Sequence, residues 1–578
     1  MGAAKINPAP VDAVPSVGLA RFLLLTAAIN GAVILVVEIL GAKMLAPFMG
    51  TSHFVWTAQI GVTLLSLAVG YYAGGSLVDR WPRAGLLYAA MTLASLFLCL
   101  SVLLVRPVCF FCLDLGDLAV GALLASVLLY FVPLALLAMT VPFLSRMLTD
   151  SVSRVGGQVG RLSALSTLGS VAGTSLIGYV LLPRVSNSTT MFAAAAVLLL
   201  LAAGYALIWG RAGRSAVAGA AVFALLLAYA GWKNERAAMQ SDSRRILYHA
   251  NSNFGELMVS ESANYYMVDG ENGGPPQPER IPWREYVNDY LVQNNYDPEI
   301  GKSLSLFTSA LYGLPQVYTP ATRDVLCIGM GVGVVPMRFA TDGARTDVVE
   351  INPQVVPLAQ AYFHFRPEQV GLHIGDGRQF LNRTTNTYDA IVLDAFLGDS
   401  TPSHLMTLEA FAAMRERLRP DGVLVINSFG RGLDDEEQKQ ADAGKFSSFV
   451  FDRAEDYLTA SLHKTLAKVF GAGGVRIHSS GNGNVFFVAA RAGQLTAHRA
   501  PDFASTQPAA NVFASEHPLL LRSTHRINRP EWMYKRVWTV APGMGDVLTD
   551  DFNPVEFHDA KNRQRTRLHL AGSMRQRQ

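Results

Sequence analysis

The segment DVLCIGMGVGVVPMRFA, residues 324–340, decides how the C-terminal half of this chain folds. Within it, Val325–Ile328 is an apolar run with β-branched residues, which is typical of a buried strand. A helix is predicted at Val334–Thr341. Three glycines lie between the strand and the helix, namely Gly329, Gly331 and Gly333. They let the backbone approach a ligand closely, although many nucleotide- and cofactor-binding folds share this signal.

Strand and helix signals alternate along the residues that follow. Further strands are predicted at Thr346–Glu350, Leu372–Ile374, Ala390–Leu393 and Val423–Asn427, and helices at Val355–Phe363 and Thr407–Leu418. This alternation predicts an α/β, doubly wound, Rossmann-like domain around a parallel sheet. A turn-rich segment between Val475–Ser479 and Val485–Ala490 predicts a hairpin after it.

Acidic residues stand where the predicted strands end. Glu350 ends the second strand, Asp376 with Gly377 follows the third, and Asp394 closes the fourth. Ligands of such sheets bind beyond the carboxyl ends of the strands, where a carboxylate can accept from both ribose hydroxyls. Each acid alone is as well explained as a helix N-cap. Three in succession after a glycine-rich turn indicate a nucleoside-binding site.

Residues 1–232 differ in composition from the rest. The whole chain is 50% hydrophobic and 16% charged with a mean hydropathy of +0.25, which excludes a disordered or collagen-like chain and a nucleic-acid-binding arm. Residues 1–232 hold 12 Lys and Arg against 6 Asp and Glu, whereas the remainder holds 36 and 39. A bilayer core needs about 20 apolar residues per helix. Seven such stretches predict a multi-span α-helical membrane domain: 19–40, 54–78, 85–106, 118–142, 162–183, 190–210 and 215–232.

The charges between these stretches bear on topology. Arginines cluster in alternate loops on the side of the N-terminus, which places the N-terminus in the cytoplasm. Seven spans would then place the C-terminal half outside. A nucleoside ligand is cytosolic, so we expect a multi-pass protein of the cell membrane with a cytoplasmic C-terminal half, and a span count accurate to one.

The region between the two halves is predicted to contain a β-hairpin. Its strands are Phe254–Ser260 and Tyr265–Asp269, and the Gly- and Pro-rich segment Glu271–Pro282 is predicted as a loop. Residues 271–302 carry acidic and aromatic side chains, which either form an amine site or a solvated acidic face. We therefore predict four parts: a transmembrane domain at 1–232, a linker with hairpin and insert at 233–320, a Rossmann-like domain at 321–495, and a C-terminal extension at 496–578.

Other reactive residues carry weaker signals. Asp399 and His404 follow Asp394 in a loop and are candidate substrate-binding residues, although a capping role explains His404 equally well. The histidines show no metal-ligand spacing, so no metal is expected. Cys109 and Cys112 have metal or redox spacing, but with no second pair and flanking phenylalanines they are interpreted as buried thiols.

Four segments together resemble the spermidine synthase family, in its membrane-fused branch. They are residues 324–338, 349–352 (VEIN), 375–378 (GDGR) and 388–396 (YDAIVLDAF). Residues 399–411 and 547–556 are also similar to segments of that branch. The resemblance implies the class I S-adenosylmethionine methyltransferase-type fold. It also implies decarboxylated S-adenosylmethionine, or S-adenosylmethionine itself, as co-substrate, an amine such as putrescine as acceptor, and methylthioadenosine as leaving group.

The resemblance also implies a role for each site residue. The glycine loop of Gly329, Gly331 and Gly333 lies beside the nucleoside, Glu350 binds the ribose, and Asp376 with Gly377 binds the adenine. Asp394 is the catalytic residue. An attacking amine must arrive unprotonated, so a carboxylate within hydrogen-bond reach can act as its general base.

The sequence departs from the family where the family recognises its amine. Phe254-Gly255 stands in place of a Tyr-Gln pair, Phe307-Thr308-Ser309 in place of Tyr-His-Glu, and Asp399 lies five residues after Asp394 where the family has a second Asp three residues on. The acceptor therefore stays open. So do three alternatives, namely a methyltransferase, an enzyme that cleaves S-adenosylmethionine, and a nucleoside-sensing membrane protein without catalysis. A homodimer is likewise left open.

Overall fold

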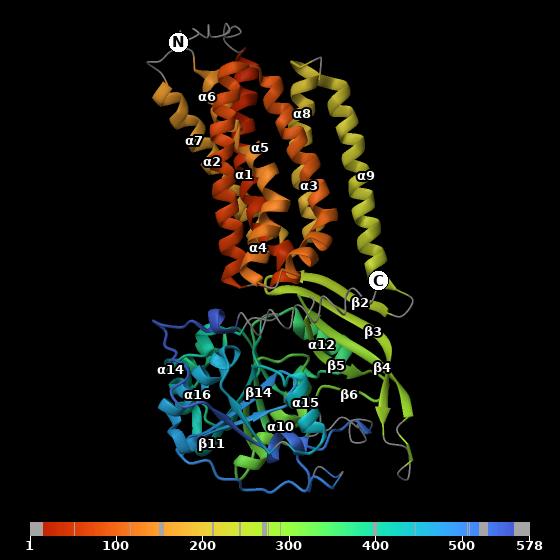
Figure 1. The fold of residues 1–578 in the computed structure, drawn as a ribbon, viewed down its shortest axis with the longest axis vertical. Coiled ribbons are helices and arrows are strands. Elements are labelled where there is room, and N and C mark those ends of the chain that lie inside the picture. The colour runs from red at the N-terminus through yellow and green to blue at the C-terminus, as the bar shows by residue number, and fades with distance from the viewer. Residues whose placement is uncertain are drawn as a thin grey trace. The chain divides into compact units, whose positions relative to one another are not determined.

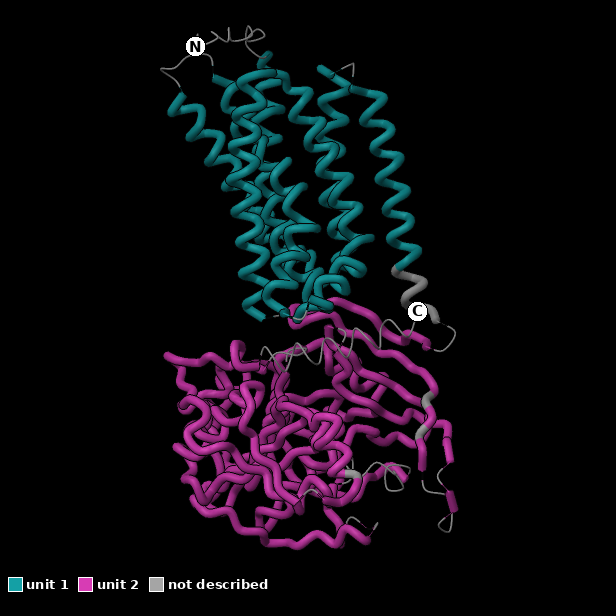
Figure 2. Tube along the Cα trace, viewed as in Figure 1, with its two compact units in different colours: residues 1–239, 567–578 teal, residues 240–566 magenta. Residues whose placement is uncertain are grey.

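The computed structural model describes residues 16–50, 52–115, 117–149, 155–210, 213–241, 244–268, 274–275, 277–289, 291–396, 401–445, 447–505, 507, 509–518 and 530–559. The chain forms two compact units, and the boundary between them lies between Met239 and Gln240 (Figure 2). Each unit is described by itself.

The first unit is a bundle of helices (Figure 1). Its elements are α1 (Val17–Met49), α2 (His53–Arg80), α3 (Ala84–Leu113), α4 (Leu118–Ser126), α5 (Val132–Ala138), α6 (Thr140–Leu148), α7 (Val155–Leu176), α8 (Asn187–Ile208) and α9 (Arg214–Met239). Among the described residues, seven helical segments are long and apolar enough to cross a membrane, with Leu118–Leu148 counting as one. Each of the seven predicted stretches corresponds to one of them.

Small residues allow α1 and α7 to pack closely. A Cβ added at Gly169 or Gly173 would overlap the α1 backbone at Ala28 or Ala32, and the Ser170 hydroxyl donates to the Gly31 carbonyl at 3.0 Å. Close backbone approach through Gly and Ser is a typical way for helices to associate in lipid.

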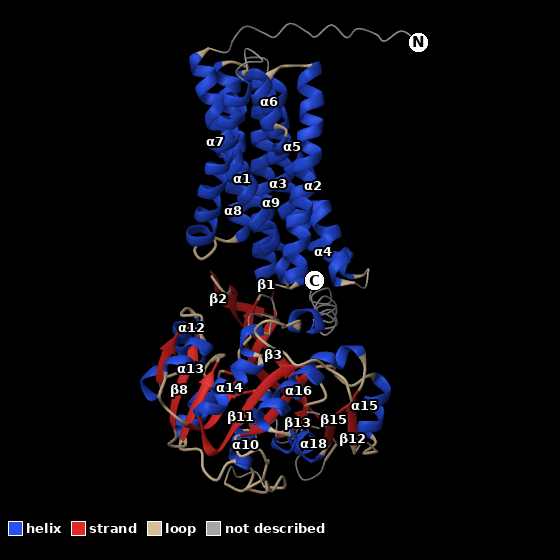
Figure 3. Cartoon of the chain, turned by 90° about the vertical axis from the view of Figure 1, so that its left-hand side faces the viewer, coloured by secondary structure: helices blue, strands red, loops and turns tan. Residues whose placement is uncertain are grey.

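The second unit is built on a nine-stranded sheet with helices on both faces (Figure 3). In spatial order its strands are β12 (Ser448–Phe451), β15 (Val537–Val540), β13 (Val475–Ser479), β14 (Asn484–Ala490), β11 (Leu418–Phe429), β10 (Tyr388–Leu393), β7 (Asp324–Ile328), β8 (Arg345–Glu350) and β9 (Gly371–Ile374). The strands from β11 to β9 are parallel, and β14 and β13 extend them as an antiparallel pair. The predicted doubly wound sheet and the later hairpin are confirmed.

Alternate residues of each central strand face opposite cores. Val325 and Cys327 pack with α10 (Leu306–Tyr318), α11 (Val334–Thr341) and α12 (Val355–Phe363). Leu326 and Ile328 pack with α13 (Gly377–Arg383), α14 (Leu408–Arg417) and α16 (Tyr457–Phe470). Burial on both faces explains why the strands are near-continuous apolar runs in the sequence.

The predicted hairpin at residues 254–269 is wrong. This region belongs to a six-stranded antiparallel sheet of β1 (Gln240–Ser241), β2 (Arg244–Ser252), β3 (Gly255–Val268), β4 (Gln277–Asn288), β5 (Leu291–Asp297) and β6 (Lys302–Ser303). Strand β3 runs without a turn through residues 262–264 and pairs with both β2 and β4.

The loop predicted for Glu271–Pro282 is wrong from Gln277 onward, because β4 begins there. Strand β5 pairs only with Arg284–Asn288 of β4, so the proline-containing start of β4 has one neighbour, β3. A proline is tolerated at such an edge because no partner there needs its missing N–H.

The C-terminal region contributes to the main sheet. Strand β15 lies between β12 and β13, pairing in parallel with the first and antiparallel with the second. Its Trp538 is buried against Phe449 and Phe451 of β12. Residues 537–540 therefore form part of the sheet that supports the site.

Candidate functional site

A cavity of about 520 Å³ lies beyond the carboxyl ends of the central strands. Pockets of this size hold small-molecule ligands. Seven of the predicted site residues line it: Gly329, Gly331, Glu350, Asp376, Gly377, Asp394 and His404. Gly333 does not line it, and Asp399 lies outside the described residues. Parallel strands bring their carboxyl ends to one edge, and the acids that follow them meet there.

The glycine loop connects β7 to α11 in a conformation that suits glycine. Gly329, Gly331 and Gly333 have φ angles of +87°, +55° and +86°, a region that other residues rarely adopt. A Cβ at Gly329 would overlap the backbone carbonyl of Asp394, and one at Gly333 would overlap the Phe365 ring. The first glycine therefore allows the loop to pack against the end of β10, and the third allows α11 to begin at its N-cap.

Glu350 holds the glycine loop and the turn after β8 in place. Its Oε2 accepts from the Met330 amide at 3.0 Å and its Oε1 from the Asn352 amide at 2.8 Å. Burial raises the pKa of Glu350, and these backbone hydrogen bonds act against that rise. Each carboxylate oxygen can accept a second hydrogen bond, so Glu350 can also accept from ligand hydroxyls in the cavity.

Asp376 has two partners. Its Oδ1 accepts from the Gln379 amide at 2.8 Å, which caps α13, and its Oδ2 lies 2.7 Å from His404 Nε2. Burial alone would raise the pKa of Asp376, but the hydrogen bonds from Gln379 and His404 outweigh it and lower this pKa below its ordinary value. Asp376 is therefore a charged hydrogen-bond acceptor at neutral pH. His404 contacts Asp376 and lines the cavity, and its predicted role in substrate binding stays a prediction.

The C-terminal segment fastens the loop that carries His404. Arg378 donates to both carboxylate oxygens of Asp550, at 2.6 and 2.5 Å, and to the carbonyl of His404 at 3.1 Å. Asn553 donates to the Ser403 carbonyl at 2.6 Å. Residues 547–556 thus act on the site through this loop.

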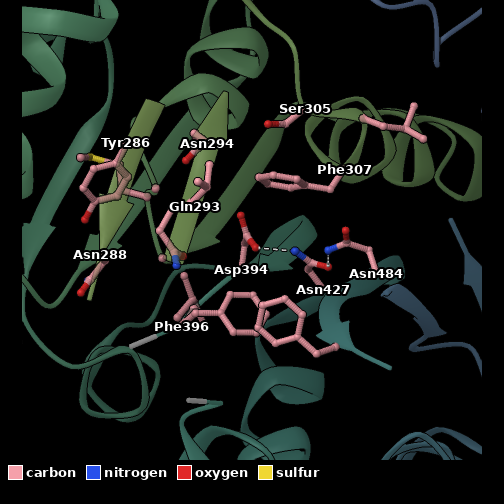
Figure 4. A pocket seen from close by; sticks show the side chains of 18 of the residues that line it. Tyr286, Asn288, Gln293, Asn294, Ser305, Phe307, Asp394, Phe396, Asn427 and Asn484 are labelled. Atoms are coloured by element: carbon pink, nitrogen blue, oxygen red, sulfur yellow. Dashed lines mark hydrogen bonds between the residues drawn. The ribbon is translucent and has the colours of Figure 1, made fainter. Parts of the chain in front are cut away.

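Asp394 directs its side chain into the cavity and has a different environment. Its Oδ1 accepts from Asn427 Nδ2 at 2.8 Å, and Asn427 Oδ1 accepts in turn from Asn484 Nδ2 at 3.1 Å (Figure 4). Burial raises the pKa of Asp394 to about 6, against a lowering by the Asn427 hydrogen bond. A carboxylate with this pKa is ionised at neutral pH and suited to take a proton.

Apart from Phe307, which departs from the family's pattern, the neutral side chains around Asp394 did not stand out in the sequence. Asn427 ends the predicted strand Val423–Asn427 and lies two residues before the end of β11, near the same edge of the sheet as the three acids, so its position was a usable signal. Figure 4 shows Phe307 and Phe396 directed toward the same space as Asp394. Further rings come from Phe429, Phe503 and Phe513. Phe503 and Phe513 lie in a segment without strand or helix periodicity, so no sequence pattern pointed to them.

The acidic insert supplies neither of its two predicted functions as a whole. Glu285 pairs with Arg244 at 3.0 Å and accepts from Trp283, Asp289 accepts from the Glu256 amide, and Asp297 lies 3.1 Å from the buried His517. These three acids are buried and do not line the cavity. They tie the six-stranded sheet together, whereas neighbouring neutral residues such as Tyr286 and Asn288 face the cavity.

Within the described ranges, no three His, Cys, Asp or Glu side chains are arranged to hold a metal ion. All four cysteines are buried free thiols, including Cys109 and Cys112.

Comparison with known proteins is specific for the second unit. Residues 305–458 match the spermine/spermidine synthase domain, so the chain contains a domain of this kind. The polyamine aminopropyltransferase of Vibrio vulnificus (strain CMCP6) is 39% identical over 119 residues, which are 20% of this chain and 40% of that protein. The N-terminal histidine N-methyltransferase of Emericella nidulans is 36% identical over 124 residues, 21% of this chain and 22% of that protein. The chain therefore spans less than half the length of either relative.

A crystal structure of spermidine synthase from Thermotoga maritima matches this structure over 43% of this chain and 73% of that chain, with 18% sequence identity and a TM-score of 0.30.

Proposed function

We propose that the second unit is an aminopropyltransferase that uses decarboxylated S-adenosylmethionine and an amine acceptor and releases methylthioadenosine. The observation that carries this proposal is Asp394. Its carboxylate, with a pKa raised to about 6, faces a cavity that also holds Glu350 and Asp376. The match of residues 305–458 to a spermine/spermidine synthase domain supports the same activity.

The residues divide the work between binding and proton transfer. Glu350 and the glycine loop would bind the ribose and orient the nucleoside, and Asp376 would accept from the amino group of the adenine. Asp394 would take a proton from the ammonium form of the acceptor. The freed amine nitrogen then attacks the methylene next to the sulfonium, the carbon–sulfur bond breaks, and the sulfur keeps the electron pair as a neutral thioether.

The chemistry can be tested on the purified full-length protein. It is incubated with decarboxylated S-adenosylmethionine or S-adenosylmethionine, with and without a panel of primary amines, and the products are identified by mass spectrometry. Methylthioadenosine together with an alkylated amine is the expected result. S-adenosylhomocysteine would refute the proposal in favour of methyl transfer.

A second candidate is favoured by the family's missing acceptor residues. Phe254 and Phe307 line the cavity in place of polar family residues. Without an amine acceptor, the carboxylate of S-adenosylmethionine would attack its own methylene next to the sulfonium and close a lactone while the sulfur keeps the electron pair. Methylthioadenosine would then appear at the same rate in the absence of any amine.

We further propose that the seven apolar helices cross the cell membrane and that the second unit is cytoplasmic. An odd number of spans then places the N-terminus outside, so this proposal sets aside the orientation that the arginine pattern predicts. The native cysteines are buried, so an introduced exposed cysteine reports topology. Asp421→Cys should resist a membrane-impermeant maleimide in intact cells and react after lysis. Labelling in intact cells would place the unit outside.

A further inference from the structure

The order of the strands divides the cavity at Asp394. Strands β7, β8 and β9 lie on one side of β10 and bring the glycine loop, Glu350 and Asp376. Strands β11 and β14 lie on the other side and bring Asn427 and Asn484. In a displacement at carbon, the nucleophile approaches opposite the leaving sulfur. The acceptor therefore belongs on the side of β11 and β14, which we call the acceptor half.

The acceptor half is neutral and aromatic. Its walls include Phe307, Phe429, Asn482, Asn484, Phe503 and Phe513. The rings of Phe503 and Phe513 stack at 5.8 Å with an angle of 9° between their planes, and the rings of Phe396 and Phe429 lie 4.6 Å apart.

Charged groups are scarce among the described residues of the acceptor half. No Lys or Arg is found among the described residues that line the cavity. Apart from Asp394, the carboxylate found there is Glu531, which lies 2.5 Å from Lys535 Nζ and is 48% exposed. Glu531 is thus already paired and solvated.

We infer that the acceptor is a primary amine with one cationic group and an apolar, preferably aromatic, tail, and not a diamine. This inference rests on the proposed aminopropyl transfer. A second ammonium group would lose its water here without gaining a carboxylate partner among the described residues, and a buried charge without such a partner is strongly unfavourable. A cation on a phenylalanine face recovers only part of that cost. An aromatic tail would instead stack on the rings that are present.

The transfer to such an acceptor needs only Asp394 as the proton acceptor and methylthioadenosine as the leaving group. The ammonium gives one proton to Asp394, its nitrogen forms the new bond to the aminopropyl methylene, and the sulfonium leaves as methylthioadenosine. The product is a secondary ammonium with the same apolar tail. No oxidant, reductant or further reactant is needed.

Three amines test the inference on the full-length protein with decarboxylated S-adenosylmethionine. Butylamine and putrescine have the same carbon chain and differ in the distal ammonium, while phenethylamine adds a ring. The kcat/KM values, expressed per free base, should be at least fivefold higher for butylamine than for putrescine and higher again for phenethylamine. A higher value for putrescine than for butylamine would overturn the inference and leave the proposed function standing.

A pair of variants tests the missing carboxylate directly. Asn482 is an exposed turn residue on the cavity wall, and aspartate before glycine suits the same turn. Asn482→Asp should therefore raise the putrescine-to-butylamine ratio of kcat/KM several-fold. Asn382→Asp makes the same change at an exposed position of α13 outside the cavity and should leave the ratio unaltered. An unaltered ratio in both variants would contradict the inference. Absence of any alkylated amine would refute the proposed function and the inference with it.

Discussion

Replacing Asp394 by asparagine should abolish activity while stabilising the fold. Asparagine has the same shape, and its Oδ1 can still accept from Asn427 Nδ2, now 2.8 Å from Asp394 Oδ1. The variant loses the general base, which contributes about 10²- to 10⁴-fold to rate. It also loses a buried charge. The pKa of Asp394 is raised from 3.8 to about 6, so at pH 8 the ionised carboxylate weakens the folded state by up to about 3 kcal/mol relative to its protonated form.

The sign of this effect depends on pH. An acid whose pKa is raised by folding holds its proton more tightly in the folded state, and the stability it contributes below pH 3.8 is lost as pH rises through about 6. The Asp394→Asn variant should therefore have a higher Tm than the parent at pH 8, and this advantage should shrink at pH 5.

The assay combines methylthioadenosine release with thermal unfolding of the full-length protein in detergent. Asp421→Asn is a matched control, because Asp421 is exposed and remote from the cavity, and its rate and Tm should equal those of the parent. Retained activity in Asp394→Asn would refute the catalytic role. A lower Tm at pH 8 would show that Asp394 is a structural residue whose loss disturbs the site.

Three further predictions address the groups around this carboxylate. The kcat/KM of the parent should fall as Asp394 takes up a proton, with the midpoint of the pH profile at about pH 6. Asn427→Ala should move this midpoint upward by as much as one pH unit, because one hydrogen bond to a charged group is worth about 1.5 kcal/mol. An unmoved midpoint would assign the titration to another group. Glu350→Gln should weaken methylthioadenosine binding at least tenfold in calorimetry, because one of its two amide partners would face an NH₂ group; unaltered affinity would exclude Glu350 from the ribose site. Gly329→Ala should lower stability by about 2 kcal/mol or more, through its positive φ and its overlap with the Asp394 carbonyl. Gly343→Ala, with a φ of +88° and open space around it, should cost less, and an equal loss in both would mean that backbone conformation alone sets the effect.

The main sheet and the positions of its acids could be predicted because local signals and tertiary structure agree there. Buried parallel strands are apolar on both faces, so they stand out as runs such as Val325–Ile328. Their carboxyl ends share one edge, so Glu350 and Asp394 had to meet even though 44 positions separate them in the numbering.

The six-stranded sheet could not be predicted in the same way. Whether residues 262–264 form a turn or the middle of β3 depends on β4, which pairs with all three, and on β2, which pairs with Ser262. The prolines of β4 resemble loop residues because the sequence does not show that the pairing of β4 with β5 ends at Arg284. Such outcomes depend on pairings between segments, to which local propensity is only a weak guide.

The roles of the three acids follow from the partners that each strand end supplies. Glu350 and Asp376 are held by backbone amides of the turns they close, and these amides favour the charged, accepting form. At the end of β10, the Asp394 backbone amide donates a hydrogen bond to the Ile328 carbonyl. Leu393 lies opposite Ile426 of β11, and this register places the Asn427 side chain beside the Asp394 carboxylate. One side-chain amide compensates burial less than several backbone amides do. Burial raises the pKa of Asp394 to about 6, and its carboxylate lies at the strand that separates the two halves of the cavity, where it can exchange a proton with an acceptor.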